Sequence, residues 1–396
     1  MLSILETLGC LYWTQKFISL FDFKFSPQNR GKGIILQIAS RIPLVFINLY
    51  AGFDLFVILT GKMYIAVATS ITALAVSTLD LFLTKGGCVL ATTYFAVQRK
   101  KHLKFIDDVA NFEEKLCHFF GAEVFRKRKF LKRKFNFEAI IILFHDFTYN
   151  LILLTQIENV LILDAELIIW YICLISQATI LDYLAFYIMG YINIFMNSLE
   201  MFNLKKVSKE KRIQIFYFLM DFIRIIDRIN ALFSIYLFAV MAHRVIEASS
   251  ICFFLFIVIS DVPMEYLYLL AFFIICCILW SWGDIYIMMR IGKVGETLNR
   301  KMDSVIRNMA LFYNEQEERK DTQNCINLNI KHFLLRFLHK SNNINVGDIN
   351  INLNLVCKVL TVLASNLIVL IEFKTYEELS ALLAKSNTKN VTLSGL

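Results

Sequence analysis

Long runs of apolar residues alternate along the chain with segments rich in Lys and Arg. Runs of 18 or more apolar residues are typical of membrane-spanning helices, because only helices and closed barrels satisfy every backbone polar group in lipid. The runs are not built of alternating apolar and polar positions, so helices are favoured over strands. The pattern therefore predicts an all-α, seven-transmembrane helical bundle. The expected spans are residues 34–59, 63–97, 136–154, 167–195, 229–259, 264–285 and 353–373.

The second run is too long for one straight crossing. Its sequence TKGG, at residues 84–87, is expected to kink the helix or to end its membrane part. Two spans in this region are the alternative, but the apolar segment after TKGG is too short to cross by itself.

Lys and Arg are distributed unevenly between the two sides that these spans define. Of the 41 basic residues, 33 lie in segment 1–33 and in the loops 98–135, 200–228 and 286–349. The opposite side carries four. Because basic loops stay in the cytoplasm, the sequence predicts a cytosolic N-terminus and an extracellular C-terminus. This topology is inverted relative to G-protein-coupled receptors, and it opposes that class.

The links on the external side are short, whereas two cytosolic segments have apolar residues at helical spacing. FIDDVANFEEKLCHFF and VGETLNRKMDSVIRNMALFYNEQ are expected to extend spans and pack on one another or on neighbouring subunits. Amphipathic helices lying on the membrane are the alternative. A single glycosylation triplet, NVT, places a candidate site at Asn390 in the external tail.

Motifs of catalysis and of cofactor binding do not occur in the sequence, so an enzyme is not expected. Neither a cofactor nor a metal site is expected. The six His are not spaced like metal ligands, and the nine Cys have the pattern of free thiols in a protein core. His145 and Asp146 are adjacent and are expected to point to different sides of a helix. The basic runs are interpreted as topology signals, with no nucleic acid as partner. The N-terminus has no basic start of a cleavable signal.

The C-terminal stretch ASNLIVLIEFK resembles the last span of the insect gustatory receptor family. That span ends in Thr-Tyr, five apolar residues and Gln-Phe. Here it reads Ser365-Asn366, then LIVLI, then Glu372-Phe373. VGDININ before the span and DRINALFSIYLF at the start of span five are similar to two further segments of the family, and length and topology agree.

The resemblance implies a tastant-gated, non-selective cation channel in the plasma membrane of a chemosensory neuron. It implies a homo- or heterotetramer with related receptors, with a small organic tastant, permeant cations and lipid as partners. Sugar-sensing members carry Glu where this chain has Leu367, which favours bitter or other non-sugar compounds. A polytopic transporter of small solutes is the alternative, but no matching breaks occur in two halves of the chain.

The same resemblance divides the chain by role. The expected parts are a cytosolic N-terminal segment at 1–33, a ligand-binding bundle at 34–285, a cytosolic helical anchor at 286–352, a pore-lining helix at 353–373 and an extracellular tail at 374–396.

Within span seven, a helix places Lys358, Val362, Ser365, Val369 and Glu372 on one stripe. Around a fourfold axis the stripe would form rings, with Val369 as an apolar gate and Glu372 as a carboxylate ring at the outer mouth. Ser365 and Phe373 complete this candidate pore site. The simpler interpretation is that Glu372 only marks the end of a span.

Ionisable residues inside spans mark partners or function, because each costs about 2.5–3.5 kcal/mol to insert. Arg41, Asp54, Asp80, Asp146 and Asp182 are such residues, and His243, Arg244 and Glu247 follow in span five. Arg244 and Glu247 are three residues apart, so they can form a structural ion pair or a polar anchor for a ligand. Aromatic residues near the outer face are candidates to line the pocket, or to form the interfacial aromatic belt instead. The candidate ligand-binding residues are Tyr149, Trp170, Tyr171, His243, Arg244, Glu247, Tyr266 and Tyr268.

Overall fold

The computed structural model describes residues 3–17, 30–60, 71–121, 128–155, 165–199, 209–261, 267–318, 331–332, 334–335, 344–346 and 349–393. Its elements are α1 (Ile4–Thr7), α2 (Cys10–Phe17), α3 (Arg30–Leu59), α4 (Ile71–Val97), α5 (Arg99–Phe120), α6 (Arg128–Thr155), α7 (Ala165–Leu199), α8 (Lys209–Asp261), α9 (Leu267–Glu318), β1 (Asn345–Val346), β2 (Ile349–Asn350) and α11 (Leu353–Leu393). The all-α prediction is confirmed for these residues, apart from one two-stranded hairpin.

The described part of each predicted span falls within a long helix: α3, α4, α6, α7, α8, α9 and α11. Residues 63–70 of the second span and 264–266 of the sixth lie outside the described residues. Among the described residues, five segments are both long and apolar enough to cross a membrane. They are Ile71–Val97, Ile175–Ser198, Tyr217–Ile257, Ala271–Leu311 and Leu353–Leu383. α3 contributes only the shorter apolar stretch Leu44–Leu59, and no segment of α6 meets both criteria. A helical fold with several segments able to cross a membrane is therefore observed, while the count of seven crossings stays a prediction.

The TKGG sequence does not end the second helix. α4 continues from Ile71 to Val97 through Gly86 and Gly87, so the two-span alternative is wrong for this part of the chain. A Cβ added at Gly86 would meet no atom within 4 Å, and one at Gly87 would only touch Leu181 at 3.7 Å. These glycines leave open space beside α4, which becomes one wall of a cavity.

Helix α7 lies at the centre of the bundle and contacts α2, α3, α4, α6, α8 and α9. Of an 18-residue stretch within its apolar segment, 89% is buried. This continuous burial explains why α7 is apolar around its whole circumference instead of along one stripe.

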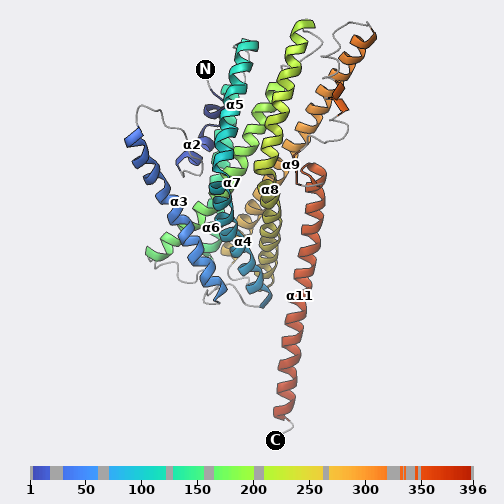
Figure 1. The fold of residues 1–396 in the computed structure, drawn as a ribbon. Coiled ribbons are helices and arrows are strands. Elements are labelled where there is room, and N and C mark those ends of the chain that lie inside the picture. The colour runs from blue at the N-terminus through green and yellow to red at the C-terminus, as the bar shows by residue number, and fades with distance from the viewer. Residues whose placement is uncertain are drawn as a thin grey trace.

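The two segments that were expected in the cytosol are helical, one forming α5 and the other the end of α9, whereas their packing on one another stays a prediction. α8 and α9 each continue without a break beyond the apolar spans, and α5 packs against α8 (Figure 1). Phe105, Phe112 and Leu116 of α5 are fully or almost fully buried there, and Lys115 pairs with Asp221 at 2.7 Å. Burial also lowers the pKa of His102, near the start of α5, to about 3.

The N-terminal segment is part of the core, which its assignment as a plain cytosolic segment did not anticipate. Ile4, Leu8 and Leu11 are almost completely buried, and α2 contacts α6 and α7. A Cβ on Gly190 would come within 2.5 Å of the Leu8 side chain, so this glycine of α7 leaves room for the N-terminal turn.

The hairpin formed by β1 and β2 leads directly into α11. Ile351 N donates to the Ile344 carbonyl at 2.8 Å, and the Asn352 side chain caps the helix by accepting from Leu355 N at 2.9 Å. A Cβ on Gly295 would lie 2.0 Å from the Ile351 carbonyl oxygen. α9 therefore needs glycine where the hairpin meets α11.

α11 begins at Leu353, the first residue of predicted span seven, but it continues past Phe373 to Leu393. Residues 374–393 contain neither Gly nor Pro, so nothing in the sequence stops the helix. The helix projects beyond the bundle and carries the C-terminus far from the N-terminus, which lies beside α5 (Figure 1). The external location of this segment stays a prediction.

Candidate functional site

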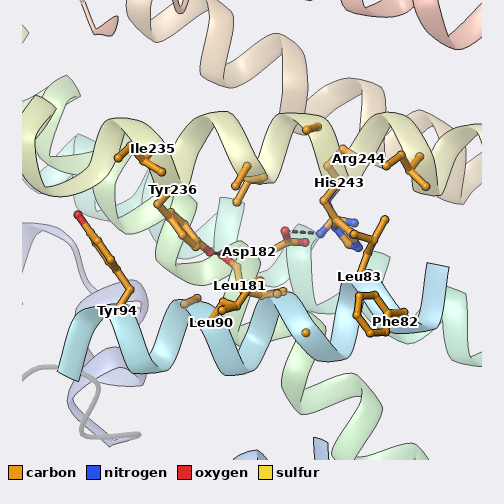
Figure 2. Close-up of a pocket in the computed structure, with 17 residues that line it drawn as sticks. Phe82, Leu83, Leu90, Tyr94, Leu181, Asp182, Ile235, Tyr236, His243 and Arg244 are labelled. Atoms are coloured by element: carbon orange, nitrogen blue, oxygen red, sulfur yellow. Dashed lines mark hydrogen bonds and ion pairs between the residues drawn. The ribbon is translucent and has the colours of Figure 1, made fainter. Parts of the chain in front are cut away.

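A cavity of about 530 Å³ lies between α4, α7 and α8. Its walls are largely apolar. Gly86, Gly87 and Ala91 of α4 have no or small side chains and so leave space for the cavity. Figure 2 shows Tyr94 and Tyr236 toward one end, and Asp182, His243 and Arg244 grouped farther along, near Phe82. A mostly apolar cavity of this size with a few convergent polar groups is typical of small-molecule sites.

Arg244 is the centre of the polar group. Its Nη1 donates to Glu247 at 2.5 Å and to Asp284 of α9 at 2.9 Å, and its Nη2 donates to Asp182 of α7. The guanidinium is 2% exposed, and its three carboxylate partners are 3% exposed or less. The predicted pairing of Arg244 with Glu247 is confirmed, and two carboxylates from other helices join it.

His145 of α6 extends this network. Its ring stacks on Trp280 with a centroid separation of 3.9 Å and an interplanar angle of 15°. Nε2 lies 3.2 Å from the Trp280 carbonyl and 3.6 Å from Asp284 Oδ1, and Nδ1 lies 3.3 Å from Asp146 Oδ1. The expectation that His145 and Asp146 point to different sides is wrong. Consecutive helical residues are only about 100° apart, and both face inward because α6 packs on α7 and α9.

The ring stacking depends on a glycine. A Cβ on Gly283 would come within 1.8 Å of the His145 ring, so any side chain at this position of α9 would displace the imidazole.

His243 connects the cluster to the cavity. Its Nε2 lies 3.1 Å from Thr84 Oγ1, and its Nδ1 lies 3.7 Å from Glu247 Oε2. Thr84 Oγ1 also donates to the Asp80 carbonyl at 3.0 Å. Since that hydroxyl has one proton to donate, Nε2 of His243 is assigned as the donor to Thr84, and Nδ1 is left as an acceptor.

Two groups of side chains bring donor atoms within 4.8 Å of one another, a spacing that suits a metal ion: Asp80, His243 and Glu247, and separately His145, Asp146 and Asp182. The sequence spacing of the histidines did not indicate either group, because their members come from different helices. Arg244 already occupies oxygens of Asp182 and Glu247 and competes with a cation at both places.

A second buried ion pair lies nearby. Lys85 Nζ contacts Asp54 Oδ2 of α3 at 2.5 Å and lies 5.9 Å from the centroid of the Tyr50 ring. Lys85 directly precedes Gly86 and Gly87 of the cavity wall. Its positive charge pairs with Asp54 and not with the carboxylates around Arg244.

The structure brings together only part of the predicted ligand site. His243 and Arg244 line the cavity, and Glu247 lies behind them, bonded to Arg244. Tyr149 lies on α6, Trp170 and Tyr171 on α7 and Tyr268 on α9, but their side chains are outside the described set. Tyr266 lies outside the described residues, and so does the side chain of Arg41.

The predicted pore residues share one face of α11. Ser365, Val369, Glu372 and Phe373 are exposed, as are Lys358 and Val362 of the same stripe. The opposite face is covered, with Leu367 and Leu370 packing against Phe253 and Ile257 of α8. Farther along, Glu377 accepts from Ile71 N at 2.8 Å and from Thr72 Oγ1 at 3.0 Å, at the start of α4. Asn390 lies within α11, but its side chain is not described.

Residues that the sequence did not single out complete the cavity and the cluster. Asp284 falls at the end of predicted span six, where an acid is unremarkable, and its neighbour Gly283 was the only local signal. Tyr94 and Tyr236 are single aromatics in apolar runs, and their positions facing one cavity follow only from how α4 packs on α8.

Neither a protein-family model nor a curated protein sequence matches the chain. Solved structures do match its backbone, and two of them are of the insect olfactory receptor OR5 from Machilis hrabei. One has a TM-score of 0.54 at 10% identity and covers 93% of this chain and 100% of the receptor chain. The other, in complex with eugenol, has a TM-score of 0.58 at 11% identity and covers 93% and 97%.

The chain has the fold of an insect olfactory receptor. The likeness extends over nearly the whole of both chains, and both of these solved structures are of a receptor and not of an enzyme. At this identity it concerns the fold alone.

Proposed function

We propose that this chain is a subunit of a chemoreceptor channel of the gustatory type, opened by a small organic compound and permeable to cations without strong selectivity. The observation that carries the proposal is the receptor fold along 93% of the chain, with an apolar cavity between helices of its bundle. The resemblance of the last span to gustatory receptors favours taste, and Leu367 favours a non-sugar tastant, such as a bitter compound.

The proposed ligand site is the cavity between α4, α7 and α8, with His243 and Arg244 in its wall and Glu247 behind them. Tyr149, Trp170, Tyr171, Tyr266 and Tyr268 remain proposed residues of its outer part. The cavity volume of about 530 Å³ suits a compound of drug-like size or smaller.

The proposed pore is lined by the exposed stripe of α11 from each of four subunits. The four subunits are identical copies of this chain or include related receptors. Exposed apolar side chains such as Val369 and Phe373 would then be covered by neighbouring subunits or would face the pore. Val369 is the proposed gate and Glu372 the carboxylate ring, with Ser365 one turn before the gate. Four carboxylates around one axis attract cations.

The proposed orientation has the N-terminus, α5 and the ends of α8 and α9 in the cytosol, with the end of α11 outside. This follows the distribution of Lys and Arg. The proposed location is the plasma membrane of a chemosensory neuron, and Asn390 is a proposed glycosylation acceptor.

The test is current recording from lipid bilayers that contain the purified full-length chain, with a panel of non-sugar tastants applied. Ligand-dependent unitary cation currents are expected. Saturable solute uptake without unitary currents would instead support a transporter.

The pore assignment is tested in the same recordings with Glu372→Gln, and Glu378→Gln is the matched control on another face of the helix. Glu372→Gln is expected to lower the permeability of divalent relative to monovalent cations, because it removes the carboxylate ring. Equal permeability ratios for Glu372→Gln, Glu378→Gln and the unchanged chain would contradict the pore assignment.

A further inference from the structure

The polar end of the cavity carries an excess of negative charge. Asp182, Glu247 and Asp284 all contact the single guanidinium of Arg244. When all are ionised, three carboxylates and one guanidinium leave two negative charges. Inside a helical membrane bundle such an excess is strongly disfavoured, and either a bound cation or protonation of a carboxyl group relieves it.

The charged and titratable groups of the neighbouring helices do not remove the excess. On α4, Lys85 is paired with Asp54 of α3, and Asp80 adds a carboxyl group close to His243 and Glu247. On α6, His145 faces the Trp280 carbonyl, Asp146 and, at 3.6 Å, Asp284 Oδ1 of the cluster. A positive charge on His145 is offset by the carboxylate of Asp146, so these two residues together add no net charge to the cluster.

Two residues with acceptor atoms line the cavity. Asp182 uses Oδ1 to bind Arg244, its carboxyl group also lies close to Asp146 of α6, and its Oδ2 is buried without a hydrogen-bond donor among the described residues. His243 also lines the cavity, and its Nδ1, assigned as an acceptor, faces the Glu247 carboxylate at 3.7 Å. His243 Nδ1 and the Glu247 carboxylate are both acceptors, so neither supplies the hydrogen that the other needs. A donor that carries positive charge would bond to them and would also offset the excess of negative charge.

We propose that the cavity takes a small hydrophobic amine, with its ammonium group at the end lined by Asp182 and His243 and its apolar body between α4 and α8. The proposal rests on the proposed function, because it names the ligand class of that same cavity. The apolar walls, with Tyr94 and Tyr236 toward the other end, bury the body of such a molecule (Figure 2). The ring of Phe82 lies near the polar end, and aromatic rings attract cations.

The binding test uses the purified full-length chain in detergent, and it compares three probes with the same phenyl ring and alkyl chain. These are 4-phenylbutylamine, 4-phenylbutan-1-ol and 4-phenylbutanoate, and the measured quantity is the rise in unfolding temperature with probe concentration. The amine is expected to reach its half-maximal effect at a concentration at least about tenfold lower than the other two, which corresponds to about 1.4 kcal/mol. Equal potency of the alcohol, or higher potency of the carboxylate, would overturn the proposal.

The place of binding is tested by filling the cavity from α4. Gly86→Leu adds a side chain where a Cβ meets no atom within 4 Å, so folding is expected to persist while the amine effect is lost. Gly52→Leu is the matched control, because Gly52 has the same open surroundings on α3 and does not line the cavity. An amine effect that survives Gly86→Leu would place the binding elsewhere and refute the site.

The role of charge is tested at His243. His243→Lys supplies a resident ammonium to the cluster and is expected to weaken the amine effect at least about tenfold, whereas His243→Gln keeps an acceptor and is expected to retain most of it. Full amine binding by His243→Lys would count against the proposal. A saturable shift with ZnCl₂ alone, lost in His243→Gln and accompanied by no amine shift, would replace the amine by a metal ion bound through Asp80, His243 and Glu247.

These outcomes are separate from those of the channel proposal. Currents opened by neutral tastants, together with no preference for the amine in binding, would refute the amine as the ligand class and would still support the channel proposal. Saturable amine binding without any current would support the amine as the ligand class and would refute the channel proposal.

Discussion

Helices α7 and α11 are both apolar enough to cross a membrane, yet they differ in what surrounds them. In α7, 89% of an 18-residue apolar stretch is buried within the chain, whereas in α11 the corresponding share is 6%. Asp182, in the apolar part of α7, bonds to Arg244 of α8, whereas Glu372 of α11 is exposed and forms no ion pair among the described residues. The partners of an acid in α7 therefore belong to this chain, and those of the α11 stripe are to be sought outside it.

The comparison predicts that the largest loss of stability comes from removing the cation of the α7 cluster. Arg244→Met leaves three buried carboxylates without their guanidinium, and breaking such a buried pair costs about 3–5 kcal/mol. The measurement is the unfolding temperature and the monodisperse yield of the full-length chain in detergent. The control is Lys115→Met, which breaks the more exposed pair with Asp221 and is expected to cost about 0–1 kcal/mol. Equal stability of these two variants would contradict the prediction that the buried cluster around Arg244 contributes more to stability than the exposed pair of Lys115 and Asp221.

A smaller but still clear effect is expected at the glycine beneath the cluster. Gly283→Ala places a Cβ within 1.8 Å of the His145 ring, and overpacking of this kind costs about 1–3 kcal/mol. The same substitution at Gly52, where nothing lies within 4 Å, is expected to raise stability by about 0.5–1 kcal/mol, because alanine favours the helix. Thermal unfolding of both variants measures the difference. A stabilising Gly283→Ala would show that His145 does not have to stack where the structure places it.

The sequence was sufficient for the helices and for contacts within one helix. The apolar run at residues 229–259 predicts a helix, and α8 contains it. α8 begins earlier, at Lys209, within the segment 200–228 that was expected to be a loop. The pairing of Arg244 with Glu247 follows from their three-residue spacing. Ile4, Leu8 and Leu11 also have helical spacing, but they were assigned to a plain cytosolic segment because nothing local indicates which surface they cover.

Contacts between helices were beyond sequence reasoning. Asp182 and Asp284 reach Arg244 from 62 and 40 residues away, and His145 reaches Trp280 across 135 residues. Such pairings depend on which faces of α6, α7, α8 and α9 pack together, and the apolar runs carry little information on this point because they are apolar around the whole helix. The cavity has the same origin, since small residues of α4 become a wall only when α7 and α8 lie opposite.

The smallest expected effects distinguish two acids on α11. Glu377 accepts from the backbone of Ile71 and from Thr72, so it satisfies an otherwise unpaired donor at the start of α4 and places negative charge at a helix N-terminus. Glu377→Ala is expected to cost about 1 kcal/mol of stability, as the loss of a helix cap does.

Glu372→Ala is expected to change the stability of the dissociated subunit by no more than about 0.5 kcal/mol, since the side chain is exposed. Its effect is expected in channel currents instead, where Glu377→Ala should leave the ratio of divalent to monovalent permeability unchanged. Unfolding curves of the dissociated subunit and bilayer recordings of the assembled channel, made on both variants, measure the two effects separately. A large stability loss in Glu372→Ala would mean that this acid has a partner within the chain, and the contrast between α7 and α11 would then not extend to Glu372.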